Sequence, residues 1–140
     1  MNREILFRGK RVDNGEWVYG DLIKNLIHDG REKEIRIGDI YFEHNGDIHG
    51  TEVRKVIPET VGQFTGLTDK NGKKIFEGDI LVFAEAEEPQ DERSEVVFGD
   101  GKFKLKYFEY TYSDDLDTDT AKYQVVVGNI HDGIYGEDKK

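Results

Sequence analysis

Cysteine is absent from the 140-residue sequence, and its absence removes two classes of site at once. Disulfide bonds and thiolate metal centres are excluded, and nothing in the chain points to an oxidising compartment. Proline is scarce, with two residues against sixteen glycines. This composition predicts many tight turns and no proline-rich linker.

Long apolar segments are missing as well. The N-terminal stretch MNREILFRGKR is charged and lacks the apolar core of a signal peptide or of a membrane span. We therefore expect a cytoplasmic protein with no membrane partner. Hydrophobic residues make up 36% of the chain, which is enough for the core of one ordinary domain with polar loops outside it.

Positive charge is outnumbered, because twenty Lys and Arg residues face thirty Asp and Glu residues, giving a net charge of −10. Residues 84–119 hold twelve acids and four bases, whereas the other 104 residues hold eighteen acids and sixteen bases. A region this acidic repels phosphate backbones, so direct nucleic-acid binding is not expected. It suits a basic protein partner, although acidic loops often serve only to keep a chain soluble.

Helical periodicity is also missing, and short runs of branched and aromatic residues recur between turn signals instead. The segment 102–107, KFKLKY, predicts a strand with Phe103, Leu105 and Tyr107 on one face. A bulge at residues 107–108 is expected to shift the alternation for the tyrosines that follow. The predicted fold is mainly β, with short antiparallel strands and at most one or two short helices.

Two turns precede similar segments of the chain. Asn14-Gly15 predicts a type I′ hairpin, because both central residues of that turn need a positive φ. Asn71-Gly72 precedes the run Ile80–Phe83, whose four apolar residues predict a strand covered on both faces. Each segment contains a Gly-Asp pair, at 20–21 and 78–79, where glycine is expected to bend the chain and aspartate to bond a nearby N–H. The similarity fits either a duplication or repeated use of one hairpin pattern.

The motifs of common enzyme classes are absent. The sequence contains no P-loop, no G-x-S-x-G and no H-E-x-x-H motif. Asp79, Asp100 and Lys102 match an acid, acid-x-Lys pattern of some metal-dependent nucleases, but a chain with 36% charged residues produces such a match by chance. We expect no enzymatic activity and no catalytic residue.

Metal-ligating patterns are weak. The four histidines include His44 and His49, whose spacing in a turn-rich region is not typical of a metal pair. Residues 115–119, DLDTD, begin like a calcium loop, but Thr120 stands where glycine is needed and Val126 where a bidentate glutamate is needed. No metal site and no cofactor are predicted.

Candidate partner-binding residues lie at the C-terminal end of the acidic region. Aromatic side chains that follow a strand into a polar loop are expected at the surface, where they suit protein contacts. Carboxylates of the same loop would meet a basic partner. The candidate set is Tyr110, Tyr112, Asp114, Asp115, Asp117 and Asp119.

Three blocks of the sequence resemble the YopX family, whose members are carried by phages and prophages. The central block, QFTGLTDKNGKKIFEGDI at 63–80, is long and specific. An N-terminal block at 3–22 contains REILFRGK, NGEWV and GDL. The third block consists of VVFGDGKF at 96–103 and VGNIHD at 127–132.

The resemblance implies a phage or prophage accessory protein with a mainly β fold that includes an SH3-like barrel portion. It implies no activity, so no catalytic residue is carried over. Segments 84–94 and 109–120 are longer than the family pattern needs, and any function there would belong to this chain alone. The chain is interpreted as a single YopX-like domain over 1–140, with an N-terminal β subregion at 1–57 and a barrel-like region at 58–136.

Two functions are compatible with these observations. The first is a non-enzymatic binding or assembly module that contacts a protein partner or further copies of itself, since exposed edge strands suit both. The alternative is an acidic decoy, in which carboxylates of residues 84–119 take the place of phosphates on a host nucleic-acid-binding protein.

Overall fold

The computed structural model describes residues 3–24, 34–42, 48–87 and 92–135 of the chain. It divides into two compact units, residues 1–63 and 64–140, and the division falls within strand β5 (Gly62–Thr68). The regular structure is almost entirely strand, so the mainly β fold is confirmed. The single-domain interpretation stays a prediction. No helix in the described residues has the length and hydrophobicity needed to cross a membrane.

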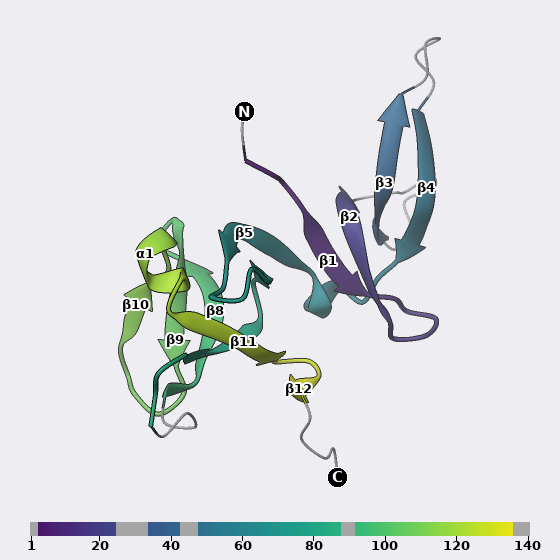
Figure 1. Ribbon diagram of the computed structural model, residues 1–140. Coiled ribbons are helices and arrows are strands. Elements are labelled where there is room, and N and C mark those ends of the chain that lie inside the picture. Colours follow the sequence, from purple (N-terminus) through teal and green to yellow (C-terminus); the bar gives the residue numbers. More distant parts are fainter. Residues whose placement is uncertain (1–2, 25–33, 43–47, 88–91, 136–140) are drawn as a thin grey trace. The chain divides into compact units, whose positions relative to one another are not determined.

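The first unit is an antiparallel sheet in the order β4-β3-β2-β1 (Figure 1). Its strands are β1 (Phe7–Lys10), β2 (Trp17–Lys24), β3 (Ile35–Phe42) and β4 (Ile48–Lys55). After β4 comes a 3-10 turn, η1 (Pro58–Thr60), and the start of β5 then pairs with β1, with Gly62 opposite Arg8. Ile37 and Val56 are buried in this unit, and the Lys10 N–H donates to Thr60 Oγ1 at 2.8 Å.

Trp17 begins β2 and contacts two cations of β1. The Arg8 guanidinium carbon lies 4.6 Å and the Lys10 ammonium nitrogen 5.7 Å from the centre of the tryptophan ring. Both distances are within the range of a cation–π contact. Lys10 is directly opposite Trp17 in the strand pairing, and Arg8 is two residues along the same strand. The period of two along β1 therefore places both cations on the same face as the ring.

The hairpin predicted at Asn14-Gly15 forms, but its turn is not type I′. The connection spans residues 12–15, and Gly15 has a φ of 72° whereas Asn14 does not have a positive φ. The Asn14 side chain instead accepts a hydrogen bond from the Glu16 N–H at 2.9 Å, which favours a longer loop. The paired positive φ values of a type I′ turn occur at Asp100 and Gly101, 54° and 79°.

The second unit contains a six-stranded antiparallel sheet in the order β10-β9-β8-β7-β11-β12 (Figure 1). Its strands are β7 (Asp79–Phe83), β8 (Ser94–Gly99), β9 (Lys102–Tyr107), β10 (Ser113–Asp115), β11 (Gln124–Asn129) and β12 (Gly133–Ile134). The remainder of β5 pairs with β6 (Lys74–Phe76), and a short helix, α1 (Thr118–Ala121), precedes β11. The described strands form open sheets, so the SH3-like barrel detail is not confirmed.

One face of this sheet carries the core of the second unit. The buried core residues are Ile75, Leu81, Val96, Leu105, Leu116, Ala121 and Val126. The predicted central strand is β7, where Ile80, Leu81 and Val82 are buried. The prediction of cover on both faces is wrong at Phe83, which is 37% exposed. Phe83 ends the strand, and its ring lies 6.4 Å from that of Tyr123.

The two Gly-Asp pairs have different structures. Gly78 has a φ of 88° in the turn before β7, and the buried Asp79 carboxylate accepts the Phe76 N–H at 2.8 Å, as expected for a bend. Gly20 lies inside β2, where a Cβ would come 2.7 Å from the Gly38 carbonyl oxygen. The predicted break at Gly20 is therefore wrong, because this glycine allows close strand approach and β2 continues. The similarity of the two segments does not extend to their structure.

Asp69 anchors the turn between β5 and β6. It is 5% exposed, and its Oδ1 accepts the N–H groups of Asn71 at 2.8 Å and Lys73 at 2.9 Å. Its Oδ2 accepts the Val126 N–H from β11 at 3.0 Å. One carboxylate therefore satisfies three backbone donors and joins the β5–β6 turn to the central part of the sheet.

Replacing Asp69 with alanine is expected to lower the free energy of unfolding by about 3 kcal/mol, because one buried and two partly buried backbone N–H groups lose their acceptor. Asp69→Asn keeps one acceptor and is expected to fall between alanine and the wild type. Urea denaturation followed by circular dichroism measures the change. Asp119→Ala is the control, since the Asp119 side chain is 92% exposed and should change stability by about 0.5 kcal/mol or less. Equal effects of Asp69→Ala and Asp119→Ala would contradict the anchoring role.

Candidate partner-binding surface

Three tyrosines form an aromatic cluster at the end of β9. We call Tyr107, Tyr110 and Tyr112 the tyrosine cluster. The rings of Tyr110 and Tyr112 are stacked with centroids 5.4 Å apart and planes 26° from parallel. Tyr107 contacts Tyr112 at 5.4 Å and meets Tyr110 edge-on at 6.2 Å. Separations of this size are those of attractive aromatic pairs.

The path of the chain explains why these rings meet. β9 ends at Tyr107, and the chain returns as β10, where Ser113 pairs with Lys106. The bulge predicted at 107–108 is wrong, because the strand stops there and the chain bends back. The Phe108 N–H donates to the Arg93 carbonyl at 3.1 Å, which extends the pairing with β8 by one residue before the chain bends. This reversal brings Tyr112 beside Tyr107.

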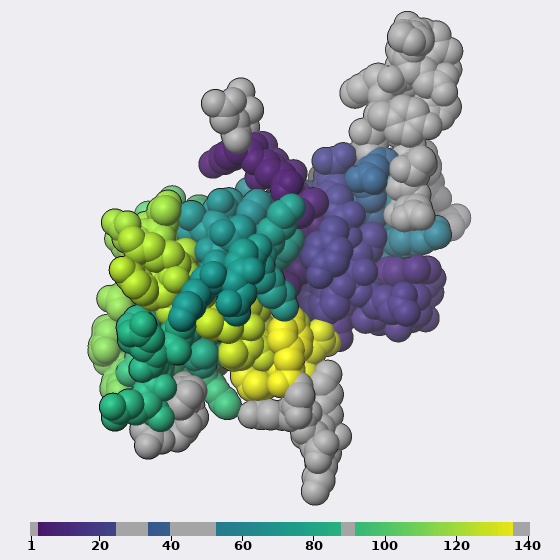
Figure 2. All heavy atoms as spheres, in the orientation of Figure 1, coloured from purple at the N-terminus to yellow at the C-terminus, as the bar shows by residue number. Residues whose placement is uncertain are grey.

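One ring of the cluster is partly buried and the other two are exposed. Tyr107 packs against the core, whereas Tyr110 is 44% and Tyr112 57% exposed. In the space-filling view the green and yellow-green atoms of this part of the chain lie on the outside of the second unit (Figure 2). Tyr110 and Tyr112 therefore present aromatic surface to solvent while their neighbour fixes their position.

Asp114 is bound to the cluster by a hydrogen bond. The Tyr107 hydroxyl donates to Asp114 Oδ2 at 2.8 Å. Burial of the phenol, followed by its bond to Asp114, raises the pKa of Tyr107 well above the ordinary value of 10.0. The phenol therefore stays protonated and neutral at physiological pH, and Asp114 is paired with a neutral donor in this contact.

The other predicted acids do not join the cluster. Asp115 pairs across β10 with Lys104 and makes an ion pair with the Lys102 ammonium at 2.9 Å, on the face opposite Asp114. This contact raises the pKa of Lys102. Asp117 caps α1 by accepting the Thr120 N–H at 2.8 Å, which lowers the pKa of Asp117.

The structure thus brings three of the six sequence candidates together: Tyr110, Tyr112 and Asp114. Asp119 lies in α1, and its carboxylate is 3.5 Å from the Lys122 ammonium. Tyr107 was not among the predicted site residues, because its place in the alternating segment 102–107 favoured the core face over an exposed aromatic face. Its position at the end of a strand could have indicated this role, because a tyrosine hydroxyl there needs a polar partner such as a nearby carboxylate.

β10 gives this surface a free backbone edge. In the described sheet it is an outermost strand and pairs with β9. All three of its residues, Ser113, Asp114 and Asp115, are exposed. An exposed edge strand offers unpaired N–H and C=O groups to another chain. Aromatic rings and hydrogen-bonding groups therefore lie next to one another here.

The residues that match a nuclease pattern are not assembled into one site. Asp79 is 1% exposed and lies at the start of β7, where it pairs with Asn129 in β11. Asp100 is at the tip of the β8–β9 hairpin and bonds Lys104 at 3.1 Å, whereas Lys102 bonds Asp115. Each group has a partner of its own, so this geometry does not favour a catalytic arrangement.

Histidine and carboxylate groups do not gather at a metal position in the described part of the chain, where no three of them could share an ion. His44 lies outside the described residues, and the His49 side chain is not among the described side chains, so the histidine pair stays untested. In the segment resembling a calcium loop, Asp115 points to Lys102 and Asp117 to the backbone of α1.

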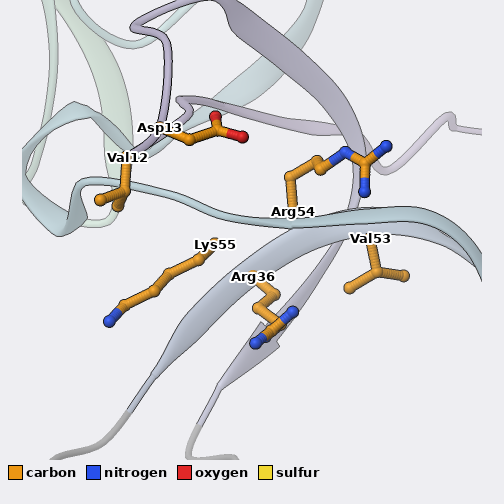
Figure 3. A pocket seen from close by; sticks show the side chains of 6 residues that line it. All are labelled: Val12, Asp13, Arg36, Val53, Arg54 and Lys55. Atoms are coloured by element: carbon orange, nitrogen blue, oxygen red, sulfur yellow. The ribbon is translucent and has the colours of Figure 1, made fainter.

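A hollow of about 310 Å³ lies in the first unit (Figure 3). Its lining residues are Val12, Asp13, Arg36, Val53, Arg54 and Lys55. Arg11 binds both oxygens of Asp13, at 2.9 and 2.7 Å, and lowers the pKa of that carboxyl. Arg36 is held by Glu34 at 2.8 Å. Arg54 lies on the opposite side of β4 from Arg36 and Lys55 (Figure 3), so the three cations do not converge on one ligand position.

The fold and the surface together define an all-β protein with an exposed aromatic patch and no assembled catalytic site among the described residues. The family description "YopX protein" matches residues 6–133, and the chain belongs to the YopX family. A crystal structure of protein EF1440 from Enterococcus faecalis is similar, with a TM-score of 0.60 and 24% identity over 93% of this chain and 95% of that one. This likeness shows a shared fold. No curated protein matches the sequence.

The raised pKa of Tyr107 predicts a pH-dependent stability. The folded chain holds the phenolic proton more tightly than the unfolded chain, so this contribution is fully present below about pH 10 and is lost as the pH rises above it. The stability of the wild type should therefore fall more steeply above about pH 10 than that of Tyr107→Phe, as measured by urea denaturation at each pH.

Asp114→Asn separates the two causes of the shift. It should lower the pKa of Tyr107 without returning it to 10.0, because burial is the largest cause and the Asp114 contacts come after it. A carbon NMR titration of the tyrosine ring, assigned with Tyr107→Phe, measures the pKa directly. Parallel stability curves for the wild type and Tyr107→Phe, or an unchanged pKa in Asp114→Asn, would contradict the Tyr107–Asp114 contact.

Proposed function

We propose that this YopX-family protein is a non-enzymatic binding or assembly module, and that the tyrosine cluster with β10 is its contact surface for a protein partner. The observation that carries the proposal is the stacking of two solvent-exposed rings, Tyr110 and Tyr112, on a partly buried third. In this proposal the protein acts in the cytoplasm as a phage or prophage accessory protein, in line with its family resemblance.

Preorganised tyrosines are well suited to protein contacts. A tyrosine buries a large area while only a few torsions must be fixed, so it loses little conformational entropy on binding. Here the rings of Tyr110 and Tyr112 are already held by each other and by Tyr107. Tyrosine is also among the residue types that dominate binding energy at protein interfaces. A partner that covers Tyr112 gains apolar burial without first ordering the loop.

The acidic-decoy hypothesis stays a prediction, and the geometry favours it less. A decoy needs carboxylates that are available to a cationic partner. Asp115 and Asp119 face lysines of the same chain, and Asp117 is used to cap α1. Lys102 and Lys104 also lie among the acids of this region, which reduces its local field.

Capture from a lysate of the organism that encodes the chain tests the contact surface. The double variant Tyr110→Ser/Tyr112→Ser should retain the partner at least about tenfold less than the wild type at physiological salt, because interface tyrosines commonly contribute more than 1 kcal/mol each. Quantitative mass spectrometry of the retained proteins measures the difference. Tyr123→Ser is the matched control, since Tyr123 is an equally exposed tyrosine of the same unit, at 50%.

Three results would count against the proposal. The first is that the wild type retains nothing above the level of uncoupled resin at physiological salt. The second is that the double variant and the wild type retain the same proteins in equal amounts. Loss of binding in Tyr123→Ser to the same extent would show a general effect of removing surface tyrosine.

A further inference from the structure

We infer that the partner segment binds as an extended strand along the free edge of β10, and that it carries arginine or lysine at alternate positions. This inference rests on the proposed function and specifies the chemistry of the same surface. It follows from the exposed edge of β10, the charge of Asp114 and the exposed ring of Tyr112.

The edge supplies the binding geometry. β10 pairs with β9 on one side, and within the described sheet it is an outermost strand with all three residues exposed. A segment in extended conformation can add to such an edge through backbone hydrogen bonds. Because β10 has three residues, these bonds are few, and side-chain contacts must supply much of the affinity.

The charge of β10 selects the sign of the partner. Two of its three residues are aspartates and none is a cation. Asp115 forms an ion pair with Lys102, whereas Asp114 accepts a hydrogen bond from the neutral Tyr107 hydroxyl. The exposed Asp114 carboxylate therefore makes no ion pair within the described residues, which favours a cationic side chain opposite it.

The neighbouring ring strengthens the same preference. Tyr112 is 57% exposed and directly precedes β10. A guanidinium or ammonium group beside Asp114 can also lie over the face of an exposed tyrosine, which adds a cation–π contact. The two faces of β10 differ, because Asp114 shares its face with Leu105 and Asp115 shares its face with Lys104. Cations are therefore favoured only on the face of the tyrosine cluster.

This difference between the faces fixes the pattern of the partner. Side chains of an added strand point alternately to the two faces of the sheet. Every second residue meets Asp114 and the cluster, and those residues should be arginine or lysine. The intervening residues meet the lysine face, where cations are disfavoured, so small polar residues such as threonine suit them.

A synthetic peptide of alternating threonine and arginine, blocked at both ends, is the probe. When this peptide is titrated into nitrogen-15-labelled protein, proton–nitrogen NMR spectra should show saturable chemical-shift changes at Ser113–Asp115 and at Tyr112. A peptide with glutamate in place of arginine should not bind. A peptide with proline in place of threonine keeps the charge but lacks the backbone N–H of every second residue, so it should bind at least about threefold more weakly.

Two variants test the side-chain contacts. Asp114→Asn keeps an acceptor for the Tyr107 hydroxyl and removes the charge, and it should weaken binding about two- to fivefold. Asp100→Asn removes the same charge from the same unit at the hairpin tip, where Asn tolerates the positive φ of 54°, and it should leave binding unchanged. Tyr112→Ser should weaken binding by a similar factor, whereas Tyr112→Phe keeps the ring and should bind like the wild type.

The outcomes separate the inference from the proposed function. If the threonine–arginine and proline–arginine peptides bind equally, the peptide is recognised without strand addition, and the inference is overturned. So would the absence of saturable shifts at β10, or equal weakening by Asp114→Asn and Asp100→Asn. If capture from the lysate still depends on Tyr110 and Tyr112 in that case, the binding module stands and only the partner chemistry is wrong.

Discussion

Asp69 joins two parts of the second unit that are far apart in the chain, because one of its oxygens binds its own turn and the other binds Val126 in β11. Three backbone N–H groups, one buried and two partly buried, would otherwise lose this acceptor, and the loss is most costly for the buried Val126 N–H. The bonded turn sets where β6 begins, and β6 supplies Ile75 to the core beneath the sheet. That core supports Tyr107, so the geometry of the exposed rings depends on this carboxylate indirectly.

The tyrosine cluster lies on the same face of β9 as the hydrophobic core, at the end of the strand where core residues no longer pack over that face. Phe103, Leu105 and Tyr107 alternate along one face of β9, and Leu116 and Ala121 cover the middle of that face. Past Leu105 the cover ends, and the same face is completed by aromatic residues that reach solvent. The cluster therefore needs no dedicated scaffold, since a core strand already fixes its innermost ring.

Local patterns were sufficient for part of this structure. The alternation in KFKLKY identified β9, and exposed aromatics were predicted at Tyr110 and Tyr112, where they lie. The turn chemistry was less predictable, because Asn14 uses its side chain to bond Glu16 and so avoids a type I′ turn. The role of Asp69 could not be predicted from local sequence, since its partner Val126 is 57 residues away. The contact between Tyr107 and Asp114 likewise depends on how the chain reverses after β9.

The distribution of aromatic residues gives the two units separate optical signatures. The chain has a single tryptophan, and Trp17 lies in the first unit in contact with two cations of β1. The second unit has tyrosine and phenylalanine but no tryptophan, and its stacked phenols are held in fixed mutual orientation. Indole emission excited at the red edge therefore reports on the first unit alone, while the near-ultraviolet dichroism of the phenols reports chiefly on the second unit, which holds five of the seven tyrosines. Unfolding of either unit can be observed in the intact chain without an added label.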